Sequence, residues 1–253
     1  MIEVVRISRL ELAFAPRPWA FAEERRDDIA RHFDQLKQVT PALWNGRMLL
    51  LHDYAIEGDV FRGAYFETDY ASFVAWRDWG FPDATVRHCF SLGALRASDG
   101  SFLLGVMNSH TLNAGKIYFP TGVPDRSDIV DGTVDLAGSI RREMAEETGL
   151  DANAYQPEQA WYCVPTRPHI AHFKLLHGRE TAAALCARIR AHLAREAQPE
   201  FADVRIVRGP ADLDPMMPVT VTTFLMYVWS QESERGPSTV GASPATLPQP
   251  GAD

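Results

Sequence analysis

The sequence predicts an α+β protein in which a small α+β N-terminal lobe precedes a larger domain. Strand and helix patterns are interspersed along the chain, and the pattern changes near residue 89 to longer strands joined by tight turns. The 253 residues, 46% of them hydrophobic, suffice for one large core or two small ones. We expect an N-terminal lobe over residues 1–88, a main domain over residues 89–231, and a disordered tail over residues 232–253, which is rich in Ser, Pro, Gly and Ala.

The elements of the N-terminal lobe follow from alternation and from turn residues. Apolar residues alternate with polar ones over residues 2–14, which predicts a strand that ends before Pro16. A charged helix is expected at residues 21–37, and Asn45-Gly46 is typical of a turn. Asp69 is expected to cap a short helix at residues 70–79. Two further strands are expected around Gly58-Asp59, at residues 47–56 and 60–67.

The main domain begins with a predicted hairpin at Asp99-Gly100, between strands at residues 89–96 and 102–107. A long β region is expected over residues 161–176, interrupted at Pro165 to Pro168. A helix over residues 180–196 and a strand over residues 201–207 follow. The apolar run at residues 219–229 fits either a buried strand or a terminal helix, because its β-branched start leaves both open.

Charge and composition exclude several classes of function. The net charge of −8 argues against a broad nucleic-acid surface, although a bound divalent metal would still allow an anionic nucleotide. No apolar run approaches the roughly 20 residues that span a bilayer, so we expect no membrane contact and a cytoplasmic location. The three cysteines, Cys89, Cys163 and Cys186, are far apart and are expected to be buried, reduced thiols.

The chemistry of the chain is concentrated in one helix. Asp135 can cap its start, Leu136, Ile140 and Met144 give it a buried stripe, and Gly149 can end it. Its last turns carry three carboxylates that share a face, those of Glu143, Glu146 and Glu147. Carboxylates gathered in this way repel one another unless cations neutralise them, and hard oxygen ligands suit Mg2+ or Mn2+. The pattern therefore predicts a metal site.

Two interpretations of the neighbouring residues stay open. Arg142 can pair with Glu146 one turn further on, or it can hold a metal-binding carboxylate in its rotamer. The alternative to a metal site is a solvent-exposed helix face that carries Arg–Glu pairs, since most runs of charged residues form such a face.

Residues Arg142–Leu150 resemble the second half of the Nudix box, which reads Arg-Glu, aliphatic, any, Glu-Glu, any, Gly, aliphatic. Every constrained position matches. The resemblance implies a Nudix α/β/α sandwich with a mixed sheet and a metal-dependent enzyme that cleaves a nucleoside diphosphate linked to another group. It also implies that Glu143 and Glu147 are direct metal ligands and that Glu146 shares a metal or acts through water.

The first half of the box departs from the family. At the standard spacing the family's glycine falls at Asp128 and its first glutamate at Val134. The turn at residues 119–125 is similar to the one that opens the box, so Gly122 can offer its backbone carbonyl to a metal, with residues 127–132 as extra loop. The residues that can replace the missing glutamate are Asp125, Asp128 and Asp131.

Further candidates lie outside the box. A later acidic residue often completes such a site or acts as the base, and Glu200 and Glu196 are the candidates. Arg167, His169 and His172 can meet phosphate, whereas no catalytic role is expected for His88, His110 and His177. Three aromatic residues can stack a base, namely Trp44, Trp76 and Trp79. Residues of this kind are more often found in the core.

The substrate prediction rests on a weaker resemblance. The chain is similar to the animal Nudix group that cleaves UDP-glucose and UDP-galactose. The shared features are an N-terminal lobe, a long insertion in the box and the absence of the first glutamate. We therefore expect a small-molecule nucleotide substrate, a nucleotide sugar in the first instance, with ADP-ribose or NADH as alternatives. A non-catalytic Nudix-fold module that binds a nucleotide or a protein is the rival hypothesis, and a homodimer is possible.

Overall fold

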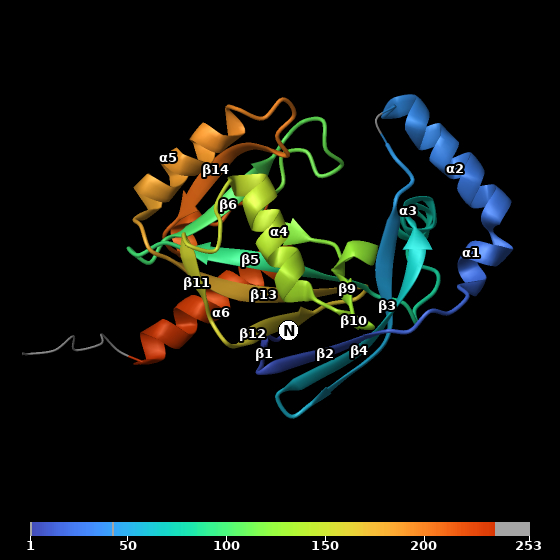
Figure 1. The fold of residues 1–253 in the computed structure, drawn as a ribbon, viewed down its shortest axis with the longest axis horizontal. Helices are drawn as coiled ribbons and strands as arrows, with labels where there is room; N and C mark the ends of the chain where they lie inside the picture. Colours follow the sequence, from blue (N-terminus) through green and yellow to red (C-terminus); the bar gives the residue numbers. More distant parts are fainter. Residues whose placement is uncertain (1, 42, 236–253) are drawn as a thin grey trace, which may run out of the picture.

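The computed structural model describes residues 2–41 and 43–235, which form two sheets and the helices packed on them (Figure 1). In this part of the chain the main sheet has nine strands, and its principal order is β1-β12-β13-β5-β6-β14. These strands are β1 (Val5–Ile7), β12 (Trp161–Pro165), β13 (His169–Gly178), β5 (His88–Arg96), β6 (Phe102–Met107) and β14 (Phe201–Val207). Three short strands join its margins, β7 (Ile117–Tyr118), β8 (Thr121–Gly122) and β11 (Tyr155–Pro157).

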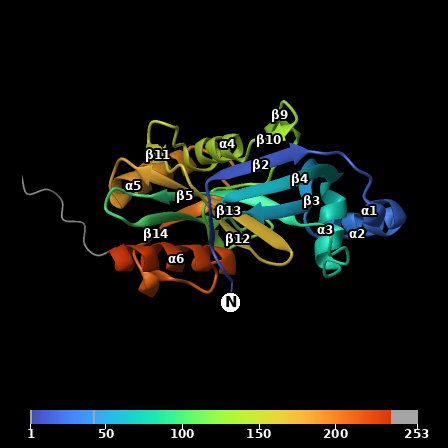
Figure 2. The same cartoon turned by 90° about the horizontal axis from the view of Figure 1, so that it is seen from below.

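Helices cover both faces of the main sheet. Helices α4 (Leu136–Thr148) and α5 (Ala182–Leu193) lie on one face, and α6 (Val219–Arg235) lies on the other (Figure 2). Antiparallel pairing of β5 with β6 and parallel pairing of β5 with β13 make the sheet mixed. The predicted α+β fold, an α/β/α sandwich with a mixed sheet, is confirmed.

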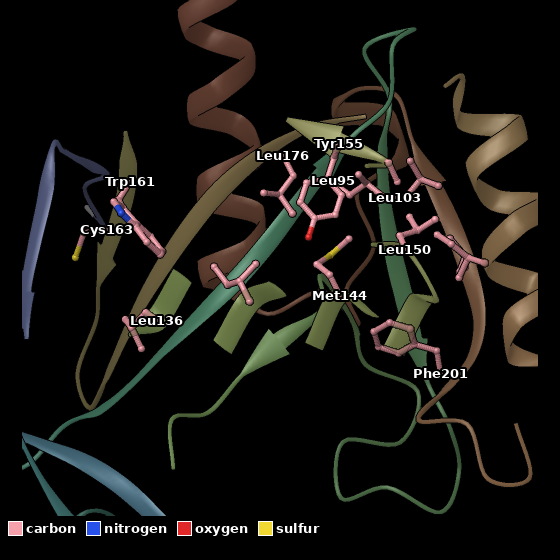
Figure 3. Packing of buried hydrophobic residues seen from close by; sticks show 14 of the residues in the cluster. Leu95, Leu103, Leu136, Met144, Leu150, Tyr155, Trp161, Cys163, Leu176 and Phe201 are labelled. Atoms are coloured by element: carbon pink, nitrogen blue, oxygen red, sulfur yellow. The ribbon is translucent and has the colours of Figure 1, made fainter. Parts of the chain in front are cut away.

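The predicted stripe of α4 is buried against the sheet. Leu136, Ile140 and Met144 are at most 3% exposed and belong to one core cluster. Figure 3 shows Leu136 and Met144 among the residues of this cluster. On the opposite face, the ring of Phe224 from α6 stacks on that of Phe173, with the ring centroids 4.3 Å apart. Because each face has its own core, the sheet is fixed from both sides and gives α4 a rigid base.

The second sheet has five strands within the described residues, in the order β3-β4-β2-β10-β9. Its strands are β2 (Arg9–Phe14), β3 (Arg47–Glu57), β4 (Val60–Asp69), β9 (Ile129–Val130) and β10 (Thr133–Val134). Three helices accompany it, α1 (Ala20–Glu24), α2 (Arg26–Val39) and α3 (Tyr70–Asp78), and Asp69 caps α3 by accepting a hydrogen bond from Ser72 N at 2.8 Å. Two 3-10 turns complete the described elements, η1 (Arg126–Asp128) and η2 (Pro210–Asp212).

The two sheets exchange strands along the chain. Strand β1 comes from the N-terminal segment but pairs with β12 of the main sheet, with Val5 opposite Cys163 and Ile7 opposite Trp161. Conversely, β9 and β10 follow the main hairpin in sequence but pair, through β10, with β2 of the second sheet. The expected division at residue 88 therefore follows the order of the chain, while each sheet holds strands from both sides of it.

Several elements differ from the expectation in detail. The strand expected over residues 2–14 is divided into β1 and β2, and the first helix into α1 and α2. The run at residues 219–229 is helical, because Val221, Phe224, Leu225 and Val228 repeat at helical spacing and are buried. Helix α6 continues through Arg235, into the expected tail, and residues 236–253 lie outside the described residues. Among the described helices, none is long and apolar enough to cross a membrane.

The three cysteines are buried and free, as expected.

Candidate active site

The site forms where the main sheet opens. Strands β5 and β6 pair next to their hairpin, at Arg96 and Phe102, and then separate. Strands β7 and β8 fill the gap, β7 against β6 and β8 against β5. The resulting opening lets side chains from α4, on one face of the sheet, reach the other face.

Gly122 of β8 lies directly against α4. A Cβ atom at this position would collide with Ser139 Oγ and stand 3.4 Å from Glu143 Cγ. Only a glycine therefore permits this approach of the strand to the helix. The predicted ligand Gly122 and the carboxylate-bearing turns of α4 are brought together at the gap.

Helix α4 begins and ends as the sequence predicts. The side chain of Asp135 accepts a hydrogen bond from Gly138 N at 2.9 Å, and Gly149 ends the helix with a left-handed φ of 68°. The three carboxylates have different environments: Glu147 is buried, Glu143 is half-buried and Glu146 is exposed. The backbone carbonyl of Glu146 accepts a hydrogen bond from His192 Nε2 at 2.9 Å.

The electrostatics of the gap are set by carboxylates that lie close together, and their burial favours the protonated form. Glu147 Oε2 accepts a hydrogen bond from Thr121 N at 3.1 Å. Burial, together with the nearby charges of Glu200 and Glu143, raises the pKa of Glu147 to about 9. Burial also raises the pKa of Glu143 to about 7, against the opposing effect of Arg142.

Glu200 is the later acidic residue that the fold brings to α4. It directly precedes β14, and its backbone carbonyl accepts a hydrogen bond from Asn108 N at 2.8 Å. The other candidate, Glu196, is exposed and lies 4.0 Å from His192 Nε2. The structure thus groups Glu143, Glu147 and Glu200 at the gap, and leaves Glu146 and Glu196 on the exposed side of the helices.

Arg142 pairs with Asp128 and not with Glu146. Its Nη1 donates to Asp128 Oδ1 at 2.5 Å, and its Nη2 donates to Asp128 Oδ2 at 3.3 Å and to Glu143 Oε1 at 3.1 Å. Of the two roles expected for Arg142, this geometry matches the holding of a carboxylate in place.

The three aspartates that can replace the missing glutamate differ in their contacts with α4. Asp128 is 4% exposed, binds Arg142 and accepts a hydrogen bond from Asp125 N at 3.0 Å. Asp125 accepts a hydrogen bond from Ser127 N, and Asp131 is exposed with a φ of 49°. Asp128 is therefore the aspartate that links residues 127–132 to α4, through its ion pair with Arg142.

A cavity of about 890 Å³ opens on the α6 side of the gap. Glu147, Glu200 and Thr121 line its inner end, and Phe90 and Leu92 of β5 line its floor. Other parts of its wall come from the N-terminal lobe, the β6–β7 loop and the start of α6. The residues of these three segments are Thr40, Leu43, Tyr70, His110, Thr111, Leu112, Asn113, Lys116, Pro218, Val219, Thr220 and Val221. The N-terminal lobe thus forms part of the cavity wall.

The residues expected to meet phosphate are separated. His169 lines the cavity, whereas Arg167 is exposed and is not among the lining residues. The grouping of His172 with them is wrong, because residues three apart on a strand point to opposite faces. The ring of His172 is completely buried under α4, with its centroid 4.5 Å from that of Phe61.

The aromatic wall of the cavity was not predicted. Of the three tryptophans, Trp76 is a core residue, whereas Trp44 and Trp79 are exposed and none of the three lines the cavity. Tyr70, Phe90 and Tyr118 line it instead, as do His88 and His110, for which no catalytic role was expected. The alternation of β5 was the available signal, since it places His88, Phe90 and Leu92 on one face.

The donor set fits a hard divalent cation. Glu147 is buried, Glu143 is half-buried and Glu200 is exposed, and repulsion among their carboxylates is the condition that a bound cation relieves. Within residues 2–41 and 43–235, no three His, Cys, Asp or Glu side chains stand close enough together to enclose a metal ion.

Comparison with known proteins gives distant structural likenesses. No protein-family model matches the chain, and no curated protein matches it. A Nudix hydrolase from M. smegmatis, RenU, is 13% identical with a TM-score of 0.38, over 60% of this chain and 88% of that one. The MutT protein from Methanosarcina mazei is 17% identical with a TM-score of 0.39, over 58% of this chain and 96% of that one.

A third similar structure is a bifunctional NMN adenylyltransferase/ADP-ribose pyrophosphatase from Francisella tularensis, complexed with AMP and a Mn ion. It is 14% identical with a TM-score of 0.41, over 63% of this chain and 46% of that one. These alignments are too distant to carry an inference by themselves. Residues 142–150 carry every fixed position of the second half of the Nudix box. They form the end of helix α4, whose carboxylates reach the gap of an α/β/α sandwich.

Proposed function

We propose that the chain is a metal-dependent Nudix hydrolase that cleaves the diphosphate of a nucleoside diphosphate derivative. The observation that carries the proposal is the position of Glu147 and Glu200, which lie at the inner end of a cavity of about 890 Å³. This volume falls within the range of roughly 300–1,000 Å³ that is usual for small-molecule sites. Burial raises the pKa of the Glu147 carboxyl to about 9, and a carboxylate perturbed in this way inside a cavity is typical of a catalytic site.

Each residue of the gap has a role in this proposal. Glu143, Glu147 and the Gly122 carbonyl would hold the metal, and Glu146, which is exposed on α4, would share it or act through a water. When bound, Mg2+ or Mn2+ would neutralise the diphosphate and activate the attacking water. Glu200 accepts the proton of that water. Arg142, held by Asp128, keeps the Glu143 carboxylate in place.

A nucleotide sugar is the proposed substrate, with ADP-ribose and NADH as the alternatives. The cavity extends from the carboxylates to Tyr70 and Leu43 of the N-terminal lobe, which gives room for groups on either side of a diphosphate. Lys116, at the cavity, can neutralise a phosphate charge. The expected homodimer and cytoplasmic location stay predictions, and light scattering of the purified protein tests the first.

One observation favours the non-catalytic alternative. Val134 stands where the family has its first glutamate, and its side chain is 3% exposed in β10. No carboxylate can reach the gap from that position. A module that binds a nucleotide without cleaving it is therefore the second candidate.

The test is hydrolysis by wild type and by Glu147→Gln. Phosphate release, coupled to a phosphatase, is measured with Mg2+ or Mn2+ on UDP-glucose, ADP-glucose, ADP-ribose and NADH. We expect metal-dependent turnover of one substrate class by wild type, and a loss of at least about 100-fold in Glu147→Gln.

The matched control is Glu196→Gln, which changes an exposed glutamate outside the cavity and should hydrolyse as wild type does. Hydrolysis by Glu147→Gln at the wild-type rate would refute the catalytic proposal. A folded wild-type protein that binds nucleotide but releases no phosphate would favour the binding module.

A further inference from the structure

Two histidines face each other at the end of the cavity opposite Glu147. His88 of β5 and His169 of β13 are paired in register, and their Nδ1 atoms are 3.3 Å apart. Leu92, four residues further along β5, pairs with Thr121, whose N–H binds Glu147. At about 3.3 Å per residue, the histidine pair lies roughly 13 Å along the strand from the carboxylate end of the cavity.

The surroundings of His88 decide which nitrogen carries its proton. Its Nε2 is buried and has no hydrogen-bond partner among the described residues. Its ring packs against those of Phe73 and Phe90, with centroids 4.7 and 4.9 Å away. The His88 ring is tilted by 46° and 36° to these two rings, whose faces carry partial negative charge and so favour a neighbouring N–H over a lone pair. We therefore assign the proton of neutral His88 to Nε2, which leaves its Nδ1 as an acceptor.

This assignment fixes the state of His169. Because His88 Nδ1 accepts, His169 Nδ1–H must donate across the 3.3 Å contact, and His169 Nε2 is left as a hydrogen-bond acceptor. The ring of His169 is held by that of Phe81, at 5.7 Å, and by that of Phe90, at 6.3 Å. His169 therefore offers a preorganised acceptor in a cavity with an aromatic wall.

The pair offers hydrogen bonds and no positive charge. Burial lowers the pKa of His88 to about 3 and lowers the pKa of His169 from its ordinary value. Both rings are thus neutral at pH 7. A neutral acceptor suits an N–H group of an uncharged ligand better than it suits a phosphate.

We propose that His169, Phe90 and Tyr70 form the nucleobase subsite of the cavity, in which the base stacks on the aromatic wall and donates an N–H to His169 Nε2. His88 is a positioning residue that fixes the tautomer of His169. The inference rests on the proposed function, which puts the diphosphate at Glu147. The distance along β5 is one that a ribose and a base together can span, and planar bases stack well on aromatic side chains.

The test is calorimetric titration of the full chain, in the presence of Mg2+, with AMP, UMP, CMP, GMP and ribose 5-phosphate. Ribose 5-phosphate lacks the base and is the matched control ligand. Wild type should bind at least one nucleotide more tightly than ribose 5-phosphate. His169→Asn, which lacks a polar atom at the Nε2 position, should weaken that nucleotide roughly tenfold and leave ribose 5-phosphate unchanged.

Matched variants separate this role from a structural one. His169→Gln, whose amide reaches the position of Nε2, should keep most of the affinity. His88→Phe, which removes the Nδ1 acceptor, should weaken the nucleotide severalfold, whereas His88→Asn, which has an amide oxygen near the Nδ1 position, should restore it. In the hydrolysis assay, His169→Asn should raise KM and leave kcat within about twofold.

Three outcomes would overturn the subsite: an equal loss for ribose 5-phosphate, no loss for any nucleotide in His169→Asn, or no preference of wild type for a nucleotide. These are binding measurements, so they do not depend on turnover. If a base-dependent loss occurs in a protein that hydrolyses nothing, the subsite stands and the catalytic proposal fails.

Discussion

At the scale of single residues, the site is defined by negative charge that the protein does not itself neutralise. Glu143 pairs with Arg142, but the guanidinium of Arg142 is shared with Asp128, and Glu147 accepts a hydrogen bond from Thr121 N while it lies against the carboxylate of Glu200. Charge of this kind is costly in a folded protein unless it is protonated or bound to a cation. Stability should therefore depend on pH and on metal.

The first prediction concerns stability without metal. The folded-state pKa of Glu147, about 9, lies above its ordinary value of 4.5. Its contribution to stability is therefore complete below about pH 4.5 and is lost as the pH rises through 9. In EDTA, Glu147→Gln should melt at the wild-type temperature at pH 5 and several degrees higher at pH 8. Thermal melts at the two pH values measure this, and a Glu147→Gln variant less stable than wild type at pH 8 would contradict it.

The second prediction concerns metal binding. At pH 8, Mg2+ should raise the melting temperature of wild type, because a cation replaces the proton between the carboxylates. Glu147→Gln should gain much less, since it has lost a ligand. An equal gain in both proteins would mean that the metal binds elsewhere.

The third prediction concerns Asp128, which holds Arg142. Asp128→Asn removes the charge that orients the guanidinium, so Arg142 no longer fixes Glu143. We expect activity to fall roughly 10–100-fold and the Mg2+ concentration for half-maximal activity to rise. Arg126→Ala is the control, because Arg126 is exposed and pairs with Glu67 away from the gap. If Asp128→Asn and Arg126→Ala have the same activity and require the same Mg2+ concentration, Asp128 has no positioning role.

At the scale of elements, the contact between β8 and α4 sets the geometry of the gap. Gly122→Ala would drive a methyl group into Ser139 Oγ, which is buried and has no hydrogen-bond partner among the described residues. The strand and the helix would have to separate, at a cost of about 1–3 kcal/mol. We expect a lower melting temperature and reduced hydrolysis. Gly209→Ala is the control, because its φ of −175° suits any residue and nothing lies within 4 Å of its Cβ position.

What the sequence could predict depends on whether an element is specified locally. The cap at Asp135, the buried stripe and the end at Gly149 all belong to α4 itself, so they were predictable. The position of Glu200 was not, because it depends on β14 pairing with β6 at a distance in sequence. The grouping of His172 with His169 at the phosphate was an avoidable error. Residues three apart on a strand point to opposite faces, so the alternation in the sequence already separates the two histidines.

At the scale of the whole molecule, the N-terminal lobe and the main domain share strands and a core. Ile7 of β1 and Phe61 of β4 lie in the same cluster of buried residues as Met144 of α4. We therefore expect one cooperative unfolding transition, measured as a single calorimetric peak whose van't Hoff and calorimetric enthalpies agree. Two separate peaks would show that the lobe is independent.

The predicted lobe boundary at residue 88 can be tested by truncation. A fragment of residues 89–235 would lack β1 and β4, which leaves the edge of β12 and the ring of His172 without their partners. Exposed strand edges and apolar surface promote association, so we expect the fragment to aggregate. A soluble, monomeric fragment with a cooperative melt would contradict this.

The pairing of β1 with β12 also bears on synthesis of the protein. Ile7 leaves the ribosome early, but its partner Trp161 follows only after about 150 further residues, roughly 8–30 s later at about 5–20 residues per second. During that interval the first strand has no partner in the main sheet. This edge of the main sheet is therefore completed late in translation, and until then the backbone of β1 lacks its native partner and is available to chaperones.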